Sequence, residues 1–88
     1  MPKIAIPTIH LNGTSRDHLI GQQNQIVEAA RALYDALRDA TPHARDYYVS
    51  NEHSIEQALE QHRAICKTVA EIEERAIQIA VAIQDQGV

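Results

Sequence analysis

The chain has 88 residues, of which 44% are apolar and 23% are charged, and its formal net charge is −4. This size and balance describe one small folded domain rather than a disordered segment. The single cysteine excludes an internal disulfide and a cysteine-based zinc site, and the acidic excess argues against a general nucleic-acid binder. No apolar run approaches the roughly 18–20 residues of a membrane span, and no signal-peptide pattern begins the chain. We therefore expect a cytoplasmic protein with no membrane contact.

Residues 1–13 predict a short strand followed by a turn. Ile4 and Ile6, then Ile9 and Leu11, alternate on either side of Pro7. A proline inside such a run favours an edge strand or a bulge, because it removes a backbone donor. The Asn-Gly pair at 12–13 is a strong turn signal.

A helix is predicted over residues 14–41. Thr14 is the expected N-cap, with Asp17 reaching back from the third position, and Pro42 ends the helix. The apolar positions recur mainly at steps of four and three, which is the seam of a helix packed along a near-parallel partner. The members of this predicted seam are Leu19, Ile26, Ala30, Leu33, Leu37 and Ala40.

A second, longer helix is predicted over residues 54–86, after a loop at 42–53. Ser54 supplies a start signal and Gly87 a stop signal. Its four–three spacing has no slip, and the positions are Ala58, His62, Ile65, Val69, Ile72, Ala76, Ile79 and Ile83.

Together these elements predict an all-α fold: one domain over residues 1–88, built as an antiparallel helical hairpin with a short N-terminal β-strand. The second helix should overhang the first at residues 76–83, a stretch that is apolar nearly all round. Such a stretch must be buried on every side, and a lone strand leaves its edges unpaired. We therefore expect a homo-oligomer, most simply a dimer that forms a four-helix bundle through residues 76–83.

The first candidate ligand-binding segment lies around the start of the first helix. Free backbone N–H groups and the helix dipole make such a start attractive to phosphate or carboxylate. The alternative for each residue is a plain turn with an N-cap. The candidate residues are His10, Asn12, Gly13, Thr14, Ser15 and Arg16.

The second candidate segment is Arg45, Asp46, Tyr47 and Tyr48, in a loop longer than most helix hairpins need. An arginine beside two tyrosines can bind an anion and stack on a ring. Alternatively, the tyrosines plug the end of the bundle and Arg45 pairs with Asp46. The two candidate segments lie at opposite ends of a hairpin, so they form one pocket only where two chains pack antiparallel.

The other candidate catalytic and metal-binding residues have weaker support in the sequence. Cys66 lies four residues after His62, but a thiol on an apolar helix face is usually packing. His53 and Glu56 can begin a metal site for which no other ligands are evident. No paired-carboxylate or Ser–His–Asp arrangement is recognisable. We expect no enzyme activity, no cofactor and no metal.

The string IPTIHLNGTS, followed by a helix, RDYY and a long helix, resembles a group of small bacteriophage and prophage proteins. The resemblance covers nearly the whole chain and depends on residues 9–15 and 45–48. Ala44 stands where the group has glycine, so this loop can bend differently.

The resemblance implies a phage context, in which small helical oligomers act as anti-defence sponges that sequester cyclic-nucleotide or ADP-ribose-derived immune signals. It suggests a non-enzymatic protein that binds a small anionic, nucleotide-type ligand between subunits. The alternative is a helical protein–protein interaction module, which inhibits a host protein or serves in phage assembly.

Overall fold

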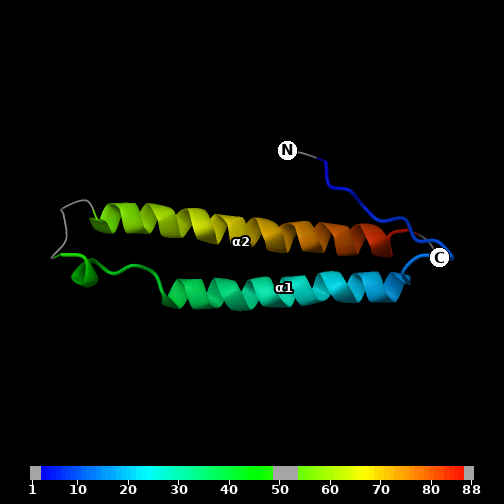
Figure 1. Ribbon diagram of the computed structural model, residues 1–88, viewed down its shortest axis with the longest axis horizontal. Helices are drawn as coiled ribbons and strands as arrows, with labels where there is room; N and C mark the ends of the chain where they lie inside the picture. Colours follow the sequence, from blue (N-terminus) through cyan, green and yellow to red (C-terminus); the bar gives the residue numbers. More distant parts are fainter. Residues whose placement is uncertain (1–2, 49–53, 87–88) are drawn as a thin grey trace.

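The structure is a computed structural model that describes residues 3–48 and 54–86, and it is a helical hairpin (Figure 1). Helix α1 spans Arg16–Asp39 and helix α2 spans Ser54–Gln84, with the 3₁₀ turn η1 at Ala44–Asp46 between them. The two helices run antiparallel along a molecule that measures 61 × 24 × 17 Å. The predicted all-helical hairpin is confirmed.

Helix α1 begins at Arg16, and its N-cap is Ser15 rather than the predicted Thr14. Ser15 has extended backbone angles, and its hydroxyl accepts a hydrogen bond from the backbone N–H of His18 at 3.2 Å. This satisfies one of the donors that a helix start leaves free. The helix ends two residues before the predicted position, at Asp39, and the Thr41 hydroxyl then donates to the Arg38 carbonyl at 2.6 Å.

The prediction of an N-terminal β-strand is wrong: residues 3–10 are extended, but no strand forms in the part of the chain that the structure describes. The segment is instead held by one side-chain amide. Gln86 accepts from the Ile9 N–H at 2.9 Å and donates to the Pro7 carbonyl at 2.6 Å. A side chain can satisfy these two groups, whereas a ladder needs a neighbouring strand and a donor that Pro7 lacks.

Three contacts fix the register of the hairpin. An ion pair of 3.6 Å joins Arg31 to Glu73, so these positions are level with each other. Arg16 reaches the Gln84 carbonyl at the open end, at 2.8 Å. Near the bend, 3.4 Å separates the Thr41 hydroxyl from the His62 ring.

This register corrects the predicted overhang. Helix α2 extends past α1 at the bend, through its first turns, and its C-terminal end lies beside the start of α1 (Figure 1). Ala76, Ile79 and Ile83 are accordingly only 1%, 3% and 0% exposed within a single chain. These three residues are buried without a second copy, whereas Val81 of the same stretch is 50% exposed.

The seam between the helices matches the predicted one in part: Ala30, Val69, Ala76, Ile79 and Ile83 are buried at predicted positions, each 6% exposed or less. The four aliphatic side chains Ile26, Leu33, Ile65 and Ile72 were expected in the seam and are instead 39–51% exposed. Val27, Ala30 and Val69, which lie next to or between these positions in the sequence, are buried. We use the name seam for the residues that face the other helix at helical spacing, of which Tyr34 stays 42% exposed: Ile20, Gln23, Val27, Ala30, Tyr34 and Leu37 on α1, and His62, Cys66, Val69, Glu73, Ala76, Ile79, Ala80 and Ile83 on α2.

Candidate functional site

The N-terminal candidate segment lies at the open end of the hairpin, and several of its residues make contacts that hold the fold together. Gly13 closes a turn onto the His10 carbonyl at 3.1 Å, with the His10 ring so close that a Cβ at Gly13 would come within 2.7 Å of it. Ser15 caps α1, and Arg16 donates to the last turn of α2. Only His10, Asn12 and Thr14 keep exposed side chains with no partner among the described residues.

The bend segment is the more open of the two. The backbone N–H of Arg45 donates to the His43 ring at 3.3 Å, while the guanidinium and the Asp46 carboxylate stay exposed and do not pair. Tyr47 is half-buried and Tyr48 is 81% exposed, so Tyr48 does not plug the bundle. A wide depression of about 620 Å³ lies here, lined by Asp39, Ala40, Thr41, Pro42, His43, Arg45, Asp46 and Tyr47.

These two candidate segments lie at opposite ends of the molecule, as the hairpin predicts (Figure 1). Neither of the two clefts found among the described residues brings them together. A site that uses both would have to take one segment from each of two chains.

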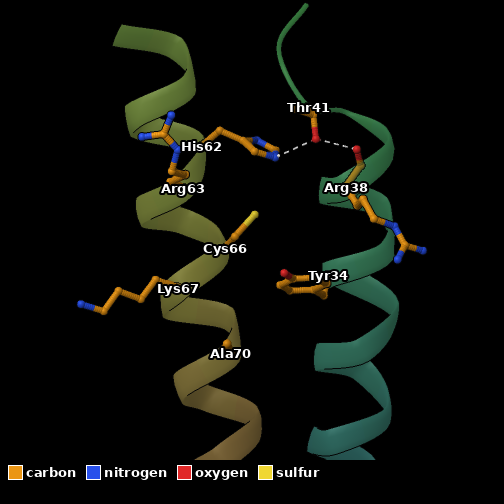
Figure 2. A pocket seen from close by; sticks show the side chains of 8 residues that line it. All are labelled: Tyr34, Arg38, Thr41, His62, Arg63, Cys66, Lys67 and Ala70. Atoms are coloured by element: carbon orange, nitrogen blue, oxygen red, sulfur yellow. Dashed lines mark hydrogen bonds between the residues drawn. The ribbon is translucent and has the colours of Figure 1, made fainter. Parts of the chain in front are cut away.

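A second cleft, of about 370 Å³, lies between the helices next to the bend, and the sequence interpretation did not identify it as a site. Tyr34 and Cys66 point into the space between α1 and α2, whereas the charged ends of Arg38 and Lys67 turn outward (Figure 2). Its lining is Tyr34, Arg38, Thr41, His62, Arg63, Cys66, Lys67 and Ala70. The sequence feature that could have indicated this cleft is Tyr34, an aromatic residue at the four–three spacing of the residues that face the other helix.

His62 and Cys66 do not form a catalytic pair in this cleft. The His62 ring turns to the Thr41 hydroxyl, and no hydrogen bond joins it to the thiol one turn away (Figure 2). An activated cysteine is typically hydrogen-bonded to its base, and Cys66 makes no such bond among the described residues. Among the described residues, no group of three or more potential ligands is placed to hold a metal ion.

An apolar face runs along the hairpin. We use this name for Ile26, Leu33, Ile65 and Ile72, which are all about half exposed. Each lies one residue before a seam residue, so it stands to the same side of its helix. Because the helices face each other and run in opposite directions, this shared offset places all four side chains on one face of the hairpin.

The flank of α1 that carries Ile26 and Leu33 has only small or uncharged neighbours: Gln22, Gln25, Ala29, Ala36 and Ala40. Helical geometry places the charged residues of α1 on the other flank or on the back. Arg31 and Arg38, for example, form their ion pairs there. The hairpin therefore has one charged face and one apolar face.

Neither described helix is long and apolar enough to cross a membrane. No protein-family model matches the sequence, and no curated protein or solved structure matches it significantly.

Proposed function

We propose that this chain works by binding rather than by catalysis, as a helical interaction module that pairs with a second copy of itself through the apolar face. The observation that carries the proposal is an uncharged stripe of aliphatic side chains along one face of the two antiparallel helices. These side chains are Ile26, Leu33, Ile65 and Ile72. A helix with one seam toward its hairpin partner and a second stripe beside it has the pattern of a four-helix bundle.

The exposed area supports a partner of about the chain's own size. The chain of 9.8 kDa exposes 6918 Å², whereas a compact monomer of this mass exposes about 5,200 Å². The excess is about twice the area of roughly 800 Å² that each partner buries in a typical stable interface. The radius of gyration of 18.6 Å, against about 12 Å for a compact domain, leads to the same inference.

The test compares two aliphatic-to-aspartate variants with matched exposure. Leu33 is 49% exposed and precedes the seam residue Tyr34, whereas Val81 is 50% exposed and follows the seam residue Ala80. The two side chains therefore lie on opposite faces of the hairpin. Leu33→Asp buries an unpaired charge in the proposed interface and should weaken self-association at least about a hundredfold. Val81→Asp should leave it within about threefold.

The readout is sedimentation equilibrium of each variant and of the unchanged chain, with circular dichroism to confirm that both variants stay helical. Equal weakening by the two variants, or none by either, would contradict the assignment of the interface to this face.

A second function is favoured by the bend: binding of a small anionic, nucleotide-type ligand between subunits. Arg45 has a free guanidinium beside Tyr47 on the rim of the wide depression, and these are the groups that bind phosphate and stack on bases. Asn12 and Thr14 of a second copy would complete such a site. This is the non-enzymatic sponge role that the phage resemblance implies.

The ligand is sought by native mass spectrometry with cyclic dinucleotides, cyclic trinucleotides and cyclic ADP-ribose isomers. One ligand per subunit interface should bind to the unchanged chain and be lost in Arg45→Ala. Arg31→Ala, which removes a cation far from the bend, is the control and should keep the ligand. An oligomer that stays empty across the panel would overturn this second function and leave the interaction module standing.

A further inference from the structure

We infer that the two copies pair antiparallel about a two-fold axis level with the Arg31–Glu73 ion pair, so that Glu71 of each copy meets Arg75 of the partner subunit. The inference rests on the proposed self-association and adds its orientation, its register and the residues that set them.

The charges on α2 give the first observation. Helical geometry places Glu71 and Arg75 beside the apolar face, whereas Arg63, Lys67 and Glu74 lie on the charged side or the back of the helix. Both Glu71 and Arg75 are exposed, and neither takes part in an ion pair or a hydrogen bond within the described chain. One negative and one positive charge therefore stand unpaired at the edge of the apolar face.

Their spacing gives the orientation. Residues 71 and 75 are equally far from residue 73, so an axis that crosses α2 at this level lays the helix antiparallel to its own copy. Each Glu71 then lies opposite an Arg75, and the pair occurs twice. Opposite charges that meet in this way favour one orientation of the partner over others.

The same axis fits helix α1 independently. The Arg31–Glu73 contact makes residue 31 level with residue 73. Rotation about residue 31 exchanges positions 26 and 36, and also positions 29 and 33. Ile26 and Leu33 then face the exposed alanines Ala36 and Ala29 of the partner subunit, large side chains against small ones, as closely packed helices require.

The other two-fold arrangement fits less well. An axis along the length of the hairpin stacks α2 on α1 of the partner subunit and places both bends at the same end. Glu71 and Arg75 would then meet the uncharged flank of α1 that contains Ala29 and Ala36, and both charges would be half-covered without a partner.

The antiparallel arrangement also brings the two candidate ligand segments together. The bend of one copy lies toward the open end of the other, so the face of Arg45 and Tyr47 approaches the Asn12–Thr14 turn of the partner subunit. Two symmetric composite sites result, one at each end of the dimer.

The test mixes two single variants. Glu71→Arg places two positive charges in each of the two proposed pairs, and Arg75→Glu places two negative charges in each pair. Each variant alone should self-associate about tenfold more weakly than the unchanged chain, because two attractive pairs become repulsive. When the two are mixed, native mass spectrometry should show the mixed dimer well above its statistical half share. Rescue between different chains cannot arise from a contact within one helix.

The control repeats the same charge changes on the charged face, with Glu74→Arg mixed with Lys67→Glu, and should give statistical mixing. If the chain is dimeric but Glu71→Arg and Arg75→Glu also give only the statistical share of mixed dimer, the proposed register is overturned while the proposed function stands. Only monomers, in the unchanged chain as well as the variants, would overturn both.

A disulfide provides a second, independent reading of the register. In a Cys66→Ala background, Ile72→Cys lies close to its own copy across the proposed axis and should give a covalent dimer on mild oxidation. In the alternative arrangement position 72 faces α1, so failure of a folded, dimeric variant to crosslink contradicts the antiparallel pairing.

Discussion

Arg16 shows how the structure assigns a residue that the sequence left open between ligand binding and architecture. Its guanidinium donates to the Gln84 carbonyl at 2.8 Å, where the last turn of α2 presents carbonyls that lack helical partners. A cation also suits the negative end of the helix dipole. The residue thus ties the end of α2 to the start of α1, and its Nε is buried without a hydrogen-bond partner.

Arg16→Gln should therefore lower the free energy of unfolding by about 1–2 kcal/mol, because it removes a charge-assisted hydrogen bond. Arg31→Gln is the matched control: it also removes a contact from α1 to α2, but Arg31 is 65% exposed and its ion pair contributes less than about 0.5 kcal/mol. Urea unfolding at one fixed protein concentration measures both. Equal losses would contradict the role given to Arg16.

Gln86 holds the N-terminal segment through both ends of its amide. Gln86→Ala should release residues 7–9, so that the Ile9 amide exchanges with solvent at least about tenfold faster, because it loses its only partner there. Hydrogen exchange read on N-terminal peptides checks this. Gln84→Ala changes an exposed side chain two residues away and should leave the exchange unchanged; an equal effect of both would point to fraying of α2 instead.

At the scale of the element, each helix carries two apolar stripes that serve different contacts. On α2, Ile79 is 3% exposed and belongs to the core of one chain, while Ile72, one seven-residue period earlier on the same stripe, is 48% exposed. Ile79 lies nearer the open end, where Gln86 holds residues 7–9 to the end of α2.

This difference predicts two distinct outcomes for the same substitution. Ile79→Asp places an uncompensated charge in the core and should unfold the hairpin, at a cost of several kcal/mol. Ile72→Asp should leave the chain helical and only prevent self-association. Circular dichroism with sedimentation separates them, and loss of helicity in both would show that the stripe belongs to the fold alone.

Four–three spacing was sufficient to predict two long helices and a hairpin. It could not show which of two overlapping frames faces the other helix. Ile26 is followed by Val27, and Leu33 by Tyr34, so both frames are apolar in α1. Ala30, Val69, Ala76, Ile79 and Ile83 of the predicted frame are buried, whereas Ile26, Leu33, Ile65 and Ile72 of the same frame are 39–51% exposed.

At the scale of the whole molecule, the long connection changes where the helices overlap. Because it allows the first turns of α2 to run past α1 at the bend, Ala76, Ile79 and Ile83 fall beside the start of α1 and are buried without a second copy. Sequence reasoning placed the overhang at the wrong end, since spacing within a helix says nothing about the register between two helices.

The candidate sites also divide into features that the sequence could predict and features that only the structure shows. That the two polar segments lie at opposite ends could be predicted from the hairpin. That Arg16 serves the fold depends on Gln84 at the end of α2, 68 residues away in the chain, whereas the capping role of Ser15 is local. The apolar face emerges only when both helices are placed together.

The most direct measurement is sedimentation equilibrium of the unchanged full-length chain over a wide range of protein concentration. The proposed interaction module predicts a dimer of twice 9.8 kDa that dissociates only on dilution. A single species of 9.8 kDa at every concentration, with the apolar face open to solvent, would contradict it.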